Sequence, residues 1–357
     1  MTAARWIALL LLLPPLATPL RADDLVSDFR LSAALGPEYD SNARREMRAR
    51  ELVQDALLRG SIASDLALQL GDQRLDASLT AGAKVFSREL SENTVAAMLS
   101  AGYRWALRHD LLVGADLSAR GRRILDGDRS YQGALVDALV SYSGLGPVTL
   151  ELRAGPRGFN YEPDPNYSNV GGGVGVGARL RLTRSEQLAI GYQLDGRYFP
   201  VAPVLVGFNV DDGTPITQPG HRTDLQHGGS LQLVSARDLF LSGSYLLLYN
   251  QSANLGETFV RHRLQVVVGV QLPLDLFASA TAALQITRYP GGLALSQRLL
   301  LEDSDESQNK LVLTLQRTLT SQLALECRLG FFSNELSDSD IAFARATAYL
   351  GITYRPP

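Results

Sequence analysis

Alternating apolar and polar residues dominate the chain from Asp28 onward. The alternation has period two and recurs in segments of about ten residues, each followed by a polar break. In one segment, apolar residues at odd positions from Leu75 to Val85 alternate with polar residues or glycine from Arg74 to Lys84. Successive side chains of a β-strand point to opposite faces, so this pattern predicts strands with one apolar and one polar face.

Sixteen segments carry this pattern, which predicts an all-β protein. They are 29–36, 62–70, 74–85, 94–105, 111–122, 132–142, 148–157, 170–182, 188–198, 224–234, 239–250, 259–272, 276–288, 309–318, 323–333 and 341–354. Alternation alone would also suit a sandwich of two antiparallel sheets.

Three features favour a closed transmembrane barrel over a sandwich. The segments reach ten residues or more, whereas strands of ordinary sheets average about five or six. Short connections, such as those at 71–73 and 108–110, alternate with longer polar ones, like the periplasmic turns and extracellular loops of membrane barrels. Aromatic residues on the apolar face gather at segment ends, as in interfacial girdles: Phe29, Tyr39, Tyr103, Trp105, Tyr142, Tyr198, Tyr249, Phe331 and Tyr354.

Charged residues are frequent on the polar face of the predicted strands. Each would cost roughly 2–4 kcal/mol at the midplane of a bilayer, so they must face a hydrated lumen. The candidate pore-lining residues are Arg120, Arg122, Arg153, Arg179, Arg181, Arg197, Arg261, Arg263, Asp116 and Asp137. A barrel of about sixteen strands leaves room for water, so we expect either a channel mildly favouring anions or a plugged barrel with a rigid network of paired charges.

Glycines on the polar face of the segment 170–182 form a flat stripe: Gly171, Gly173, Gly175 and Gly177. Such a stripe would let another chain segment lie against the wall, although strand glycines also mark bends. The absence of a following Gly-Lys-Ser/Thr sequence argues against a phosphate-binding loop.

Two segments leave the strand count open. The stretch 43–59 has helix-forming composition, so the connection 43–60 is a candidate helical extracellular loop. Its arginines Arg44, Arg45 and Arg48 would form a constriction if it folded into the lumen, and its apolar face would then rest on the glycine stripe. The stretch 293–301 is apolar enough for a strand. If both stretches were strands, the count would be eighteen, which is the alternative to sixteen.

With this architecture, the chain resembles bacterial outer-membrane β-barrels. Its last predicted strand ends Tyr349-Leu-Gly-Ile-Thr-Tyr354, similar to the terminal signal read by the barrel-assembly machinery, although Arg355-Pro356-Pro357 follows it. The run Tyr39-Asp-Ser-Asn42 resembles porin-like barrels of exopolysaccharide and surface-lipoprotein export loci, and it is also an ordinary turn-forming sequence. The resemblance implies an outer-membrane protein surrounded by lipid.

The N-terminus predicts export. Arg5 precedes an apolar run from Trp6 to Leu13, and Ala22 stands just before two aspartates. This order is typical of a cleaved secretory signal peptide over residues 1–22, which leaves 23–357 as a single barrel domain. No segment approaches 18 consecutive apolar residues, so we expect no transmembrane helix.

Composition narrows the function further. A net charge of −3 gives no basic footprint for nucleic acid, and one cysteine excludes an intrachain disulfide framework. We expect Cys327 to be buried, His109 to lie in a short turn, His221 in a long loop, and His227 and His262 on the apolar face. No histidine is expected beside a lumenal serine, so the sequence predicts neither an enzyme nor a cofactor.

The sequence therefore predicts an outer-membrane, porin-like channel for hydrophilic solutes. The first alternative is a barrel for polysaccharide export, working with periplasmic export proteins in a trans-envelope machine. The second is a non-conducting structural barrel of an envelope complex.

Overall fold

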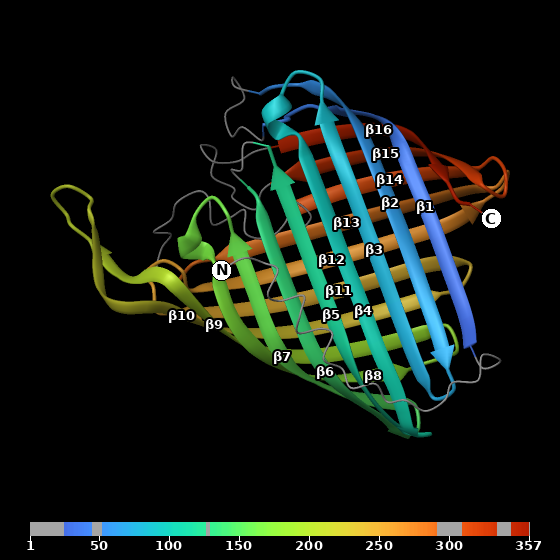
Figure 1. Ribbon diagram of the computed structural model, residues 1–357, viewed down its shortest axis with the longest axis horizontal. Coiled ribbons are helices and arrows are strands. Elements are labelled where there is room, and N and C mark those ends of the chain that lie inside the picture. Colours follow the sequence, from blue (N-terminus) through green and yellow to red (C-terminus); the bar gives the residue numbers. More distant parts are fainter. Residues whose placement is uncertain (1–24, 45–51, 126–128, 291–308, 334–343, 357) are drawn as a thin grey trace.

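The computed structural model describes residues 25–44, 52–125, 129–290, 309–333 and 344–356. Sixteen antiparallel strands form one closed sheet, in which each strand pairs with its neighbours in sequence and β1 pairs with β16 (Figure 1). The strands are β1 (Leu25–Asp40), β2 (Asp55–Leu70), β3 (Gln73–Phe86), β4 (Thr94–Arg108), β5 (Leu111–Ile124), β6 (Tyr131–Leu145), β7 (Val148–Tyr161), β8 (Asn169–Arg181), β9 (Glu186–Phe208), β10 (Pro215–Ala236), β11 (Leu239–Ser252), β12 (Phe259–Leu272), β13 (Leu276–Arg288), β14 (Asn309–Thr318), β15 (Leu323–Ser333) and β16 (Ala344–Tyr354). The predicted all-β closed barrel of sixteen strands is confirmed.

The connections define two different rims, as predicted. One rim, called here the turn rim, carries the short turns at 71–72, 109–110, 146–147, 182–185, 237–238, 273–275 and 319–322. The opposite loop rim carries longer connections, two of which contain the short 3-10 helices η4 (Leu90–Glu92) and η5 (Pro165–Tyr167). Positive φ angles of 57° at Gly71 and 68° at Gly146 let the chain reverse within two residues.

Several strands are longer than predicted, among them β2, β9 and β10. The strand β2 begins at Asp55, so residues 55–59 of the segment expected to be helical belong to the barrel wall instead. Both β9 and β10 continue beyond the loop rim and form a long projecting hairpin around residues 209–214 (Figure 1). Backbone pairing with a neighbouring strand overrode the local helical spacing in 55–59, because every residue there has a partner on β1 or β3.

The alternation places apolar side chains on the outside of the barrel and polar ones on the inside. Outward residues such as Ile62 and Leu79 are 56% and 44% exposed, because no protein covers them. Inward carboxylates such as Asp137 and Asp195 are buried, because side chains converge inside a closed sheet. The barrel therefore has an apolar outer wall and a charged inner wall.

Several predicted features lie outside the described residues, namely the signal peptide at 1–22, the possible strand at 293–301 and the loop arginines Arg45 and Arg48. Among the described residues, no helix has the length and apolar character needed to cross a membrane.

Candidate functional site: the charged inner wall

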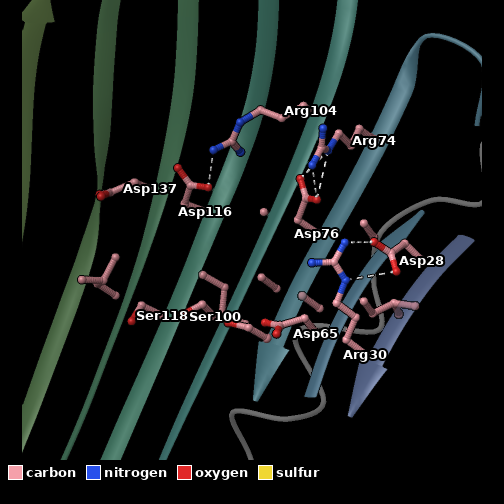
Figure 2. Close-up of a pocket in the computed structure, with 18 of the residues that line it drawn as sticks. Asp28, Arg30, Asp65, Arg74, Asp76, Ser100, Arg104, Asp116, Ser118 and Asp137 are labelled. Atoms are coloured by element: carbon pink, nitrogen blue, oxygen red, sulfur yellow. Dashed lines mark hydrogen bonds and ion pairs between the residues drawn. The ribbon is translucent and has the colours of Figure 1, made fainter. Parts of the chain in front are cut away.

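A groove of about 660 Å³ runs along the inner wall near the turn rim, over strands β1 to β7 (Figure 2). Its charged lining consists of Asp28, Arg30, Asp65, Arg74, Asp76, Arg104, Asp116, Asp137 and Arg153. Serines at positions 78, 100 and 118 lie between these charges. The groove is thus a polar, hydrogen-bonding surface rather than an apolar pocket.

Arginine–aspartate pairs organise this groove. Arg30 Nη2 lies 2.6 Å from Asp28 Oδ2, and Arg74 Nη2 lies 2.8 Å from Asp76 Oδ1. Both pairs join residues two apart on one strand, whose side chains share a face. All four side chains are largely exposed, so these pairs contribute little to stability and leave charged groups available to solvent.

A chain of ion pairs continues around the wall from β4 to β8. Arg104 Nη2 lies 2.6 Å from Asp116 Oδ1, and Arg153 Nη1 lies 3.5 Å from Asp116 Oδ2. Glu151 then lies 3.1 Å from both the Arg153 and the Arg179 guanidinium. The carboxylates are mostly covered while Arg153 and Arg179 are about half exposed, so positive charge is the part of this ladder that faces the lumen.

One ion pair crosses a whole strand. Arg157 on β7 reaches over β8 to Asp195 on β9, with Nη1 2.5 Å from Oδ1. The strand between them contributes Gly173, and a Cβ added there would lie 2.9 Å from Arg157 Cζ and even closer to Asp195 Oδ1. Part of the predicted glycine stripe therefore lies beneath a side-chain bridge, and at Gly173 it is not free to receive another chain segment.

A buried cluster fastens the first strand to the last. Arg345 Nε on β16 donates to Asp40 Oδ1 on β1 at 2.9 Å, and the Asp40 side chain is fully buried. Asp40 also accepts from the backbone N–H of Asn42, and Ser41 exchanges hydrogen bonds with Ala346. The Tyr-Asp-Ser-Asn run thus ends β1 and closes the barrel seam.

A second buried cluster lies beside this seam. Glu38 Oε1 accepts from Lys84 Nζ at 2.7 Å, and Glu38 Oε2 accepts from Arg59 Nη1 at 2.9 Å. Arg59 and Arg328 lie on the ring of Tyr349, with distances of 6.0 and 5.5 Å to its centroid. Arg59 is the last residue of the stretch expected to be helical, and it belongs instead to the barrel wall in β2.

A third cluster lies at the base of the β9–β10 hairpin. Arg222 is buried, and its Nη2 lies 2.6 Å from Asp224 Oδ2 and 2.9 Å from Glu257 Oε2. Its guanidinium carbon lies 4.0 Å from the centroid of the Phe199 ring. Burial raises the pKa of the Glu257 carboxyl to about 7, against the opposing attraction of Arg222. Sequence analysis missed this site, because it assigned Phe199 and Arg222 to a loop. The polar residues Arg222 and Asp224 continue the alternation of the following strand, and this pattern could have indicated that β10 begins earlier.

The predicted pore-lining arginines fall into three groups. Arg153 and Arg179 belong to the ladder of ion pairs that contains Asp116. The predicted lining residue Asp137 lies with its Oδ1 3.9 Å from Nη2 of Arg157. Other arginines contact rings or amides: Arg120 and Arg122 lie on Tyr131, Arg197 donates to Gln226, Arg261 contacts Phe259 and Thr287, and Arg263 donates to Gln265. Arg181 ends β8 at the turn rim and is exposed.

The remaining predicted residues have mixed outcomes. Arg44 follows β1 at the loop rim and pairs with Glu89 at 2.6 Å, which places it beside the β3–β4 connection. The prediction that His221 lies in a loop is wrong, since β10 includes it, whereas His109 does lie in a short turn. Cys327 is exposed rather than buried, because the outer wall of a single barrel has no protein cover. Within the described parts of the chain, no three His, Cys, Asp or Glu residues are grouped to hold a metal ion.

Comparison with known proteins shows a shared fold without detectable sequence kinship. No family model and no curated protein sequence matches the chain. Among solved structures, the chain is similar to OmpF of Salmonella typhi in complex with daunomycin, with a TM-score of 0.53 and 14% identity over 94% of this chain and 99% of that one. It is also similar to OprB of Pseudomonas putida at high pH, with a TM-score of 0.50 and 11% identity over 92% and 94% of the two chains. At these identities the comparisons establish the barrel fold alone.

Proposed function

We propose that this protein is an outer-membrane channel that passes hydrophilic solutes through a hydrated lumen. The observation that carries the proposal is a closed sixteen-stranded sheet whose outer wall is apolar and whose inner wall is charged. An apolar outer wall suits hydrocarbon, and a closed sheet leaves no unpaired backbone edge there. A charged inner wall requires water, which a barrel of this width has room for.

Within this proposal, the lumen favours anions weakly. Most inner-wall carboxylates are covered by arginines, so their charge is neutralised locally. By contrast, Arg120, Arg181 and Arg197 have no carboxylate within ion-pair distance among the described residues. Their charge is left to attract solutes that carry carboxylate, phosphate or sulfate groups, because interior fields are screened less than surface ones.

Planar lipid bilayers provide the test. The refolded protein should give discrete conductance steps, and a salt gradient should give a reversal potential showing that chloride permeates more readily than potassium. The triple variant R120Q/R181Q/R197Q should conduct with that preference reduced or reversed, because three positive charges are lost from the wall. A correctly folded barrel without conductance would contradict the channel proposal, and an unchanged reversal potential would contradict the role of these arginines.

A matched control uses Asp28→Asn and Arg30→Gln together. This pair lies on the same wall, and its two charges cancel locally. Removing both should leave ion preference unchanged, which separates a loss of net charge from a general disturbance of the lumen.

A further inference from the structure

Tyrosine and histidine side chains gather on the outer wall of β9 to β12, between the middle of the wall and the loop rim. This tyrosine–histidine belt consists of Tyr192, Tyr198, His221, His227, Tyr245, Tyr249 and His262. Ring contacts connect its members, with centroid distances of 5.5 Å for Tyr198–His221, 6.0 Å for His227–Tyr249 and 6.2 Å for Tyr245–His262. It includes every histidine of the chain except His109, which lies in a turn at the opposite rim.

Two hydrogen bonds fix the imidazoles of the belt. Tyr192 Oη lies 2.7 Å from His227 Nδ1, and Tyr245 Oη lies 2.7 Å from His262 Nδ1. The same arrangement thus occurs twice, once between β9 and β10 and once between β11 and β12. In both, the phenol engages Nδ1, and no protein partner engages Nε2 among the described residues.

This geometry lets each imidazole act as an outward hydrogen-bond donor. When the phenol donates to Nδ1, the neutral ring carries its proton on Nε2. When the ring is protonated, both nitrogens carry protons, and Nδ1 donates to the phenol oxygen instead. In both of these states Nε2–H is free to donate, whereas a neutral ring with its proton on Nδ1 would present Nε2 as an acceptor. A ligand rich in acceptor oxygens stabilises the donor states, so the belt suits such a ligand.

The surroundings of the belt indicate an amphiphilic ligand. In the sheet register His227 stands beside Leu194, and His262 stands between Leu247 and Ile286, which are 37% and 48% exposed. Arg288, exposed at the rim end of β13, is paired with Val260 two residues from His262. Further toward the turn rim, on the same outer face, Leu231 on β10 and Leu264 on β12 are 44% and 48% exposed. Arg288 thus lies on the loop-rim side of the histidines and further apolar side chains lie on the turn-rim side, which matches a lipid with an anionic headgroup and hydrocarbon tails.

We infer that the tyrosine–histidine belt binds the phosphate headgroup of a membrane lipid, with the Nε2–H groups of His227 and His262 as donors. The inference rests on the proposed membrane location of the barrel, and it adds a lipid site confined to one side of the outer wall. The donors on β10 and β12 hold the phosphate oxygens, while the leucine and isoleucine side chains contact the acyl chains. Such a site would fix one face of the barrel against a particular class of lipid.

Native mass spectrometry of the purified protein in a non-ionic detergent tests the inference. The titrants are dioleoyl-phosphatidylglycerol, dioleoylglycerol with the same tails but no phosphate, and inorganic phosphate. The native protein should retain phosphatidylglycerol in preference to dioleoylglycerol. The variant H227F/H262F keeps two aromatic rings but no N–H donor, and it should bind phosphatidylglycerol at least about tenfold more weakly, as expected for lost hydrogen bonds to a charged group.

Two further variants serve as controls for the histidine substitutions. H109F removes a histidine outside the belt and should bind like the native protein. Y192F/Y245F keeps both imidazoles but releases them from the phenols, so it should weaken binding less than H227F/H262F does. If H227F/H262F does not fold, Y192F/Y245F decides instead: it should bind phosphatidylglycerol more weakly than the native protein, and equal binding would overturn the inference.

Three results would overturn the inference. One is equal phosphatidylglycerol binding by the native protein and H227F/H262F. Another is displacement of the bound lipid by inorganic phosphate at matching concentration, which would indicate a soluble-anion site. The third is a changed oligomeric mass in H227F/H262F with lipid binding intact, which would make the belt an interface between copies. Conductance of H227F/H262F in bilayers should equal that of the native protein, so failure of the lipid site and failure of the channel proposal give different results.

Discussion

At the residue scale, the inner wall depends on a few positions where a side chain would not fit. Gly173 lies beneath the bridge between Arg157 and Asp195, whereas Gly175, two residues further along β8, has its nearest neighbouring atom 3.5 Å from an added Cβ. The two glycines share a strand and a face, but only one is required by its neighbours. They form a natural pair for comparison.

Gly173→Ala should lower the free energy of unfolding by about 1–3 kcal/mol, because the added methyl group displaces a buried ion pair. Gly175→Ala should be neutral or slightly stabilising, since alanine fits there and restricts the unfolded chain. Urea unfolding in lipid vesicles measures both. Equal effects of the two substitutions would show that the bridge over β8 is absent.

A titratable residue at the loop rim gives a pH dependence. Burial raises the pKa of Glu257 to about 7, so the folded state binds this proton more tightly than the unfolded state does. The resulting stabilisation is complete below the ordinary glutamate pKa and is lost as pH rises through about 7. The variant Glu257→Gln has no such proton to lose. The difference in free energy of unfolding, variant minus native protein, should therefore rise by on the order of 1–3 kcal/mol between pH 4 and pH 8. Urea midpoints at the two pH values measure it, and a difference that does not change with pH would contradict the prediction.

At the scale of one element, every strand must hold its phase, because a shift by one residue exchanges its two faces. In β5, Asp116 faces the lumen, where it pairs with Arg104 and Arg153. Ser118 shares the face of Asp116, so Leu117 between them points outward. Neighbouring positions on one strand therefore experience different solvents.

Leu117→Arg should cost roughly 2–4 kcal/mol if the barrel spans a membrane, because it places a charge in hydrocarbon. Ser118→Arg adds the same charge one residue later and should be tolerated, because it faces water. Assembly yield in vesicles reports both variants. Similar yields would mean that β5 is phased differently or does not cross lipid.

At the scale of the whole molecule, closure depends on joining strands separated by the entire chain. The seam between β1 and β16 carries a buried ion pair between Asp40 and Arg345, whereas the Asp28–Arg30 pair near the other end of β1 is exposed. Removing one partner of a buried pair leaves the other charge uncompensated and without water. In an exposed pair, water still solvates the remaining charge.

Asp40→Asn should therefore lower stability by about 3–5 kcal/mol, and Asp28→Asn by less than about 1 kcal/mol. The native barrel should migrate faster in detergent gels before boiling than after, and Asp40→Asn should lower the temperature at which that shift is lost. A transition temperature that falls equally for Asp40→Asn and Asp28→Asn would exclude a special role for the seam.

The sequence alone was enough to predict the closed barrel and the polarity of its walls, and it favoured sixteen strands over eighteen. These follow from a period-two pattern, because each residue of a strand has only two possible faces and the apolar set selects one. The same pattern placed Asp116, Asp137 and the arginines on one face. It also supported a strand count of sixteen.

Tertiary structure decided which of those charges meet. Arg157 and Asp195 are adjacent only because β8 offers a glycine between them, and Asp40 meets Arg345 only because the sheet closes on itself. Likewise, pairing with β1 and β3 drew residues 55–59 into a strand although their spacing suited a helix. A local pattern records which face a residue occupies, whereas partners across strands depend on register and closure, which involve residues far apart in sequence.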